Sequence, residues 1–172
     1  MPALEHSQAR FFLEQVALPW FSHEHPLTKK VIESIPLDKG DYRPDPISRT
    51  AFELAWHIVM AENRFLDAVA SGEFDYSGTR PEWVRNSADV AKWYAEKFQS
   101  NIQRLEKLSD EQLVRIVDFR GIRLWPAVLH LQSGLHHTIH HRGQLSTYFR
   151  PMGLKVPSIY GQSYDDAQAA KK

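Results

Sequence analysis

The chain has 172 residues with 21 basic and 21 acidic side chains, and this balance gives no general attraction to nucleic acid or anionic lipid. Hydrophobic residues make up 42% and charged residues 24% of the sequence, a globular composition that excludes wholesale disorder. The chain has no cysteine, which excludes a disulfide framework, a thiolate metal site and a cysteine nucleophile.

The length suits one domain with a core of its own, which we expect to span residues 1–164, followed by a polar tail at 165–172. Charged residues in the N-terminal stretch break the apolar core that a signal peptide needs. The longest apolar run, Val16–Phe21, is far shorter than the roughly 20 residues that cross a bilayer. We therefore expect a cytoplasmic protein without a membrane partner.

The first predicted helix covers residues 3–21, whose aromatic and aliphatic side chains form a loose apolar face. A shorter helical segment at 27–35 extends it along the chain. Residues 41–48 hold prolines and aspartates close together, and this composition predicts a loop.

A second helix is predicted after Thr50 and up to residue 71, because Thr50 and Glu53 have the spacing of a capping box. Gly72 provides the stop signal after its last turn. Apolar residues recur along one face of this helix, as expected for a helix that packs against a core. That stripe consists of Leu54, Ile58, Ala61 and Phe65.

The third predicted helix covers residues 87–108, with its first residue, a serine, as the N-cap. Residues 109–123 read as a long connection that contains at most a short helix. The fourth helix covers 126–150, since a proline suits its first turn and Pro151 ends it. Four helices without a convincing strand pattern predict an all-α four-helix bundle with long crossover connections.

Three histidines fall on the apolar stripes of the second and fourth helices. His57 lies on the stripe of the second helix, and His137 and His141 share a stripe of the fourth helix with Leu145 and Tyr148. Two imidazoles four residues apart on a helix can grip one ion, and a third from a facing helix completes a three-ligand set. Such a set leaves a coordination position open, as in catalytic rather than structural zinc sites.

The register of the histidine pair needs a choice, because His136 and His140 are also four residues apart. Their stripe is smaller and more polar than the stripe of His137 and His141, so we choose the latter pair as ligands. His140 then lies on the flank as a residue that could touch a ligand or substrate. His130 is about 10 Å further along the helix axis and too far for the same ion.

Several other residues have competing interpretations. A single buried histidine is more often a core residue than a ligand, and only the combination of all three favours a metal. The pattern is no metalloprotease motif, since Thr138 stands where that motif needs glutamate. We expect solvated side chains at His6, His23 and His25. Aromatic residues at helical spacing could line a pocket but are usually core, and these are Trp56, Tyr148 and Tyr160.

The string His-Thr-Ile-His-His-Arg-Gly-Gln at 137–144 resembles the DinB/YfiT-like family of metalloenzymes. The Leu-Ala-Trp-His-Ile segment at 54–58 and the Val-Pro-Ser-Ile-Tyr-Gly segment at 156–161 agree with this resemblance. It implies a four-helix bundle of up-down-down-up topology in which three histidines bind a divalent metal ion. By position these are His57, His137 and His141.

The resemblance also implies a class of function. Some relatives are metal-dependent transferases that activate a low-molecular-weight thiol, and others resemble hydrolases or isomerases. Applied to this chain, it implies one divalent ion, zinc or nickel first with iron or manganese as alternatives, a small-molecule substrate and a homodimer. The other hypothesis is a non-catalytic, stress-related bundle that carries a metal.

Two further residues close the string. Gly143 is expected to allow close helix packing, and Gln144 to orient a ligand or to cap a carbonyl group. Many relatives carry an acidic residue at the position of Thr138, so the sequence identifies no catalytic proton acceptor here.

Overall fold

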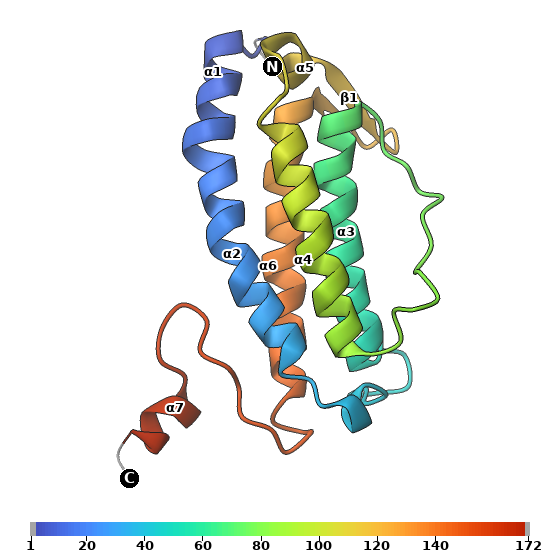
Figure 1. Cartoon of the computed structure of the whole chain (residues 1–172), viewed down its shortest axis with the longest axis vertical. Coiled ribbons are helices and arrows are strands. Elements are labelled where there is room, and N and C mark those ends of the chain that lie inside the picture. Colours follow the sequence, from blue (N-terminus) through green and yellow to red (C-terminus); the bar gives the residue numbers. More distant parts are fainter. Residues whose placement is uncertain (1–2, 171–172) are drawn as a thin grey trace.

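The first arm of the bundle is one continuous helical stretch in a computed structural model that describes residues 3–170 (Figure 1). It comprises α1 (His6–Phe11), a π-helical segment η1 (Phe12–Ala17) and α2 (Leu18–Glu33). The predicted segments 3–21 and 27–35 both belong to this stretch, and Pro26 lies inside α2. Buried side chains on both sides of this proline, among them Phe21 and Val31, anchor the stretch to the core, which outweighs the single backbone hydrogen bond that a proline removes.

The second helix, α3 (Ala51–Ser71), is reached through a short 3-10 turn, η2 (Leu37–Lys39). Its capping box is present as predicted, because the Thr50 hydroxyl accepts from the Glu53 amide at 3.1 Å and the Glu53 carboxylate accepts from the Thr50 amide at 2.8 Å. The helix ends at Gly72, whose φ of 102° lies in the left-handed region that favours glycine.

The third helix is α4 (Ser87–Leu105), and its N-cap is Asn86. The Asn86 side chain accepts from the Asp89 amide at 3.0 Å, so the predicted cap at Ser87 was wrong. The Ser87 hydroxyl instead donates to the Ile35 carbonyl oxygen at 2.7 Å and ties α4 to the end of α2. The short helix α5 (Asp110–Val114) follows, within the predicted connection.

A β-hairpin follows α5 where the sequence pattern predicted no strand. Strands β1 (Ile116–Phe119) and β2 (Arg123–Pro126) pair antiparallel, and the turn places Arg120 and Gly121 at φ values of 56° and 68°. Positive φ at both turn residues matches the twist of a tight hairpin. Four-residue strands that bury little more than Val117 are too short for a clear alternation, which explains the miss.

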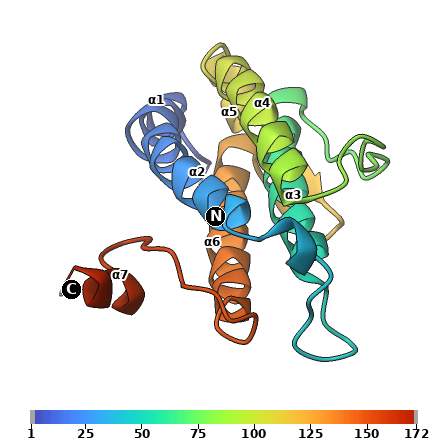
Figure 2. The ribbon, with the colours of Figure 1, turned by 60° about the horizontal axis from the view of Figure 1, so that its bottom comes forward.

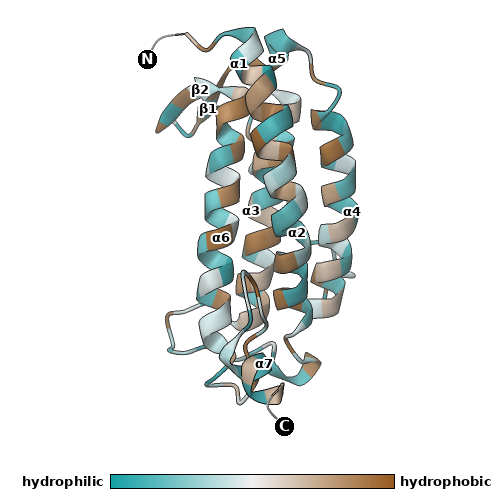
Figure 3. Ribbon diagram, turned by 90° about the vertical axis from the view of Figure 1, so that its left-hand side faces the viewer, coloured by the Kyte–Doolittle hydropathy of each residue, from teal (hydrophilic) through white to brown (hydrophobic). Residues whose placement is uncertain are grey.

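The last long helix starts later than predicted, because Pro126 is the end of β2 and has an extended ψ of 135°. A 3-10 turn, η3 (Ala127–Leu129), leads into α6 (His130–Tyr148). A short helix, α7 (Tyr164–Ala169), lies in the predicted polar tail, after a loop that turns back beside the lower end of the bundle (Figures 2 and 3).

The helices pack in a ring, in which α2 contacts α4 and α6, and α3 contacts the same two helices. Figure 1 shows α2 running down the page, α3 and α4 running up, and α6 running down again. This order of directions agrees with an up-down-down-up bundle and makes the segment between α3 and α4 a long crossover. Within residues 3–170, no helix is both long and apolar enough to cross a membrane.

The buried core is split along the bundle axis by polar side chains. One apolar cluster includes Val31, Ile58, Val59, Tyr94 and Leu145. The other includes Phe21, Leu66, Leu105, Leu131 and Leu135. Between them on α2, α3 and α6 lies a group that we call the polar layer. It consists of the buried side chains Glu24, Thr28, Glu62, Thr138 and Arg142.

Gly134 is where α6 approaches α3 most tightly, since an added Cβ would lie 2.7 Å from the Phe65 Cβ. At Gly143 no atom other than those of its own helix neighbourhood lies within 4 Å of an added Cβ, so the prediction of close packing there was wrong.

We expect Gly134→Ala to lower the free energy of unfolding by about 1–3 kcal/mol. Gly143→Ala should raise it by about 0.5–1 kcal/mol through helix propensity. Urea denaturation measures both, and equal effects would contradict this packing.

Candidate metal centre

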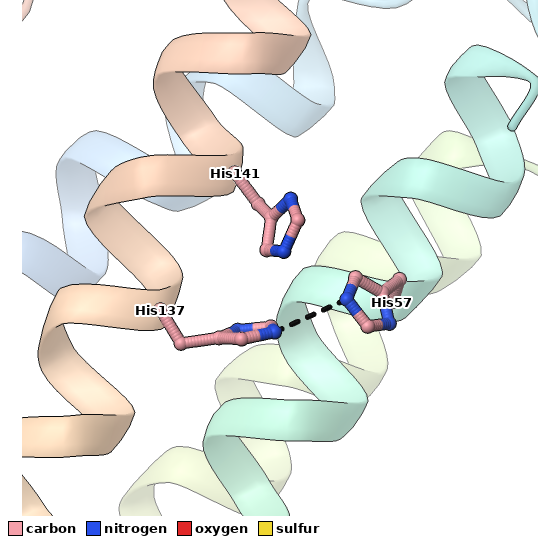
Figure 4. A group of neighbouring side chains, drawn as sticks. All are labelled: His57, His137 and His141. Atoms are coloured by element: carbon pink, nitrogen blue, oxygen red, sulfur yellow. Dashed lines mark hydrogen bonds between the residues drawn. The ribbon is translucent and has the colours of Figure 1, made fainter. Parts of the chain in front are cut away.

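The three histidines on the apolar stripes converge on one point between α3 and α6 (Figure 4). One nitrogen from each of His57, His137 and His141 can be chosen so that all three lie within 4.8 Å of one another. Their ring centroids are 4.4–4.8 Å apart, and each side chain is half-buried. The direct packing of α3 on α6 therefore brings together residues that are far apart in the sequence.

The spacing of the nitrogen atoms fits a metal ion. The Nε2 atoms of His57 and His137 are 3.1 Å apart. Two imidazole nitrogens bound at about 2.0–2.1 Å to a tetrahedral ion would lie about 3.3 Å from each other. This group of side chains could thus hold one ion with only small adjustments of the rings.

Gln144 fixes the tautomer of the third imidazole. Its side-chain oxygen lies 2.8 Å from Nδ1 of His141, so this nitrogen carries the proton and donates. The Nε2 atom of His141 then keeps its lone pair for a metal ion. The expectation that Gln144 orients a ligand is consistent with this contact.

Burial lowers the pKa of two of the imidazoles, those of His57 and His137. Desolvation, followed by the positive charge of Arg49, lowers the pKa of His57 to about 4. Desolvation, followed by the neighbouring His141, lowers the pKa of His137 to about 3. Both rings are therefore unprotonated at neutral pH, the form in which imidazole binds metal ions.

The structure brings the 137/141 pair to His57 and leaves the alternative pair outside. His136 and His140 are both exposed. The Nε2 atom of His136 contacts the side-chain amide of Gln132 at 2.8 Å, while the His140 ring lies 4.8 Å from the His141 ring at the edge of the group. His140 therefore remains a flanking residue, as expected from the sequence.

The remaining histidines divide into solvated and packed ones. His130 is fully buried and its Nε2 lies 3.0 Å from the Val117 carbonyl oxygen, so it links α6 to the hairpin. His6 and His23 are exposed, as predicted. The prediction for His25 was wrong, because this ring stacks on Phe98 at a centroid distance of 3.8 Å. Burial, with the charge of Lys29, lowers the pKa of His25 to about 4.

A buried ion pair lies directly beside the histidine group and was missed by sequence reasoning. Arg142, the residue after His141, pairs with Glu24 at 2.6 Å, and both side chains are at most 2% exposed. A second nitrogen contact of Arg142 is with Tyr160 in the C-terminal segment, at 2.5 Å. No sequence signal marks Glu24, because it lies in the stretch that the pattern left unassigned.

Glu62 is the second buried acid that the sequence pattern did not reveal. It accepts a hydrogen bond from the Tyr94 hydroxyl at 2.7 Å. Burial raises its pKa to about 7, with opposing contributions from Tyr94 and other neighbours. The pKa of Glu62 therefore lies well above that of an exposed carboxyl group.

The aromatic residues considered as pocket lining belong mainly to the core. Tyr148 is buried, and its hydroxyl donates to the Arg49 carbonyl oxygen at 3.3 Å. Trp56 packs edge-on against Trp93, with ring centroids 4.8 Å apart. The core interpretation therefore holds for Trp56 and Tyr148, whereas Tyr160 serves the ion pair described above.

Comparisons with known proteins agree with the fold. The DinB family model matches residues 10–172. The Bacillus subtilis protein YjoA is 32% identical over 152 residues, which cover 86% of this chain and 96% of that protein. The Bacillus subtilis protein YrdA is 29% identical over 146 residues, which cover 81% of this chain and 83% of that protein.

Two solved structures are similar along most of the chain. The crystal structure of YjoA, described as DinB-like, has a TM-score of 0.70 at 30% identity and covers 87% of this chain and all of that one. A DinB-like protein from Bacillus cereus has a TM-score of 0.72 at 26% identity, with 86% and 97% covered. The fold and the three-histidine group define an all-α bundle with a potential metal centre. The chain belongs to the DinB family.

Replacing any one of His57, His137 and His141 by alanine should greatly weaken metal uptake, because two imidazoles cannot complete the ligand set. The matched control is His136→Ala, which removes an exposed imidazole from the same helix and should leave uptake nearly intact. Elemental analysis of protein purified without an affinity tag gives the metal content. Equal losses in the His136→Ala and His137→Ala variants would contradict the chosen register.

Proposed function

We propose that His57, His137 and His141 bind one divalent transition-metal ion and that the protein is a metal-dependent enzyme acting on a small molecule. The observation that carries this proposal is the convergence of three half-buried imidazoles. Within residues 3–170 the group contains no fourth histidine or carboxylate, so one side of the ion is left for water or substrate. When bound, such an ion lowers the pKa of a thiol or a water and supplies a nucleophile near neutral pH.

The protein's own residues prepare the site for that chemistry. His57 and His137 are kept neutral by burial, and Gln144 orients the ring of His141. Arg49 and Arg64 are close enough to lower the pKa of His57 by their positive charge. The same charges favour an anion at the site, such as a thiolate, over a neutral or cationic ligand.

The ligand set also bears on the identity of the ion. Three imidazoles without a carboxylate suit zinc and nickel, and iron and manganese are the alternatives that we retain. The chain has no cysteine, so a thiol nucleophile must come from the substrate. We propose a thiol transferase first and a hydrolase second.

A non-catalytic, metal-carrying bundle is the second candidate function. Thr138 favours it, because this side chain is fully buried and is no general base at neutral pH. If the protein is catalytic, the bound ion therefore has to supply most of the activation.

The transferase proposal predicts that the metal-loaded protein consumes a small electrophile faster when a low-molecular-weight thiol is present. A free thiol, with a pKa of about 8.5, is mostly protonated at neutral pH, whereas a divalent ion favours the thiolate. His57→Ala should abolish the gain. Added thiol should also change the visible spectrum of the cobalt- or nickel-loaded protein. If neither the rate nor the spectrum responds to common cellular thiols, the hydrolase or the non-catalytic role replaces the transferase.

We also propose a homodimer, on the basis of family resemblance. Several large apolar side chains are exposed on the isolated chain, among them Phe11 at 63% and Trp20 at 50%. Multi-angle light scattering at micromolar concentrations should give about twice the mass of the 19.9 kDa chain. A mass near that of one chain over the whole concentration range would contradict the dimer.

A further inference from the structure

The C-terminal segment reaches the metal centre indirectly, through the buried pair of Arg142 and Glu24. Burying two charges is expensive unless hydrogen bonds satisfy their remaining donors and acceptors. Nη1 of Arg142 contacts Glu24 at 2.6 Å and the Thr28 hydroxyl at 3.1 Å. Within residues 3–170, Nη2 has one acceptor, the hydroxyl of Tyr160 at 2.5 Å.

Tyr160 serves both charges at once. Its hydroxyl accepts from Arg142 and donates to the Glu24 carboxylate at 2.9 Å. The guanidinium also lies over the tyrosine ring, 5.2 Å from its centroid. The residue as a whole is 64% exposed. Its hydroxyl therefore contacts the buried pair from the solvent side, whereas Glu24 and Arg142 themselves lie on α2 and α6.

The surrounding segment is fastened to the bundle by further polar contacts. The Lys30 side chain on α2 donates to the Ser158 carbonyl oxygen at 3.1 Å. Within the segment itself, the Asp165 carboxylate accepts from the Val156 amide at 2.8 Å. Figure 3 shows this segment turning back along the lower end of the bundle before α7. Apolar side chains of the same segment, Leu154, Val156 and Ile159, also pack against the core. Of the polar contacts, the tyrosine hydroxyl is the one that reaches a buried charge.

Arg142 and His141 are neighbours on the same turn of α6, and their side chains leave this turn in different directions. His141 faces His57 on α3, whereas Arg142 faces Glu24 on α2. A rotation or shift of this turn would displace both side chains together. Any contact that fixes Arg142 against α2 thus also fixes the imidazole against α3.

We propose that Tyr160 is a positioning residue for the metal centre. Docking of residues 154–163 on the Arg142–Glu24 pair holds the turn of α6 that carries His141, so that docking and metal binding strengthen each other. This inference rests on the proposed metal-binding function. Coupling of this kind is reciprocal, so the ion must stabilise the docked segment by the same factor by which docking raises the metal affinity.

The test compares Tyr160→Phe with a matched control, Tyr164→Phe, which removes a hydroxyl from a similarly exposed tyrosine of the same region. Zinc affinity is measured by competition with a chromophoric chelator. We expect about tenfold weaker binding for Tyr160→Phe, as is typical for residues that orient metal ligands, and wild-type affinity for Tyr164→Phe. The visible bands of the cobalt-loaded Tyr160→Phe variant should also shift, which a contribution to stability alone would not cause.

Hydrogen exchange gives a second measurement that does not use activity. Saturation with zinc should slow exchange in residues 154–163 of the wild-type chain and have little effect there in Tyr160→Phe. If Tyr160→Phe and the wild type bind zinc equally, or if both tyrosine variants weaken binding alike, the positioning role is refuted and the metal centre stands. A wild-type chain that binds no zinc, cobalt or nickel refutes the metal-binding function and this inference with it.

Discussion

The burial of polar side chains in the middle of the helix bundle is the constraint on which the rest of the structure depends. Imidazole, carboxylate and guanidinium groups lose hydration there and must be neutral, paired or bound to an ion. His57 and His137 respond by losing their charge, while Arg142 and Glu24 respond by pairing with each other. Two apolar clusters, one on each side of the polar layer, stabilise the fold and offset the cost of desolvating these polar side chains.

The order of the helices then determines what can meet at this level. The parallel arrangement of α3 and α4 requires the long crossover at 72–86 and leaves α3 free to pack against α6. This contact aligns His57 with the pair on α6. On its other side α6 meets α2, so that one helical turn carries both the metal-facing His141 and the charge-paired Arg142.

Much of this arrangement could be predicted from the sequence because it is periodic and local. The capping box at Thr50, the stop at Gly72 and the shared face of His137 and His141 follow from spacing along one helix. The features that were missed depend on partners remote in sequence or on short elements. The hairpin has strands of four residues. The half-buried His25 packs on Phe98 of α4 because α2 continues through Pro26. Tyr160 finds its partners, Glu24 and Arg142, on two different helices. Such contacts leave no periodic signal in a single sequence.

The central claim is that the three imidazoles bind one ion together, and X-ray absorption at the metal edge tests it most directly. The sample is protein produced without an affinity tag and loaded with one equivalent of zinc. The account predicts a spectrum with three imidazole nitrogens at about 2.0–2.2 Å and at least one further light ligand. A spectrum with fewer than three imidazole ligands, or complete loss of the ion on dialysis, would contradict binding of one ion by all three histidines.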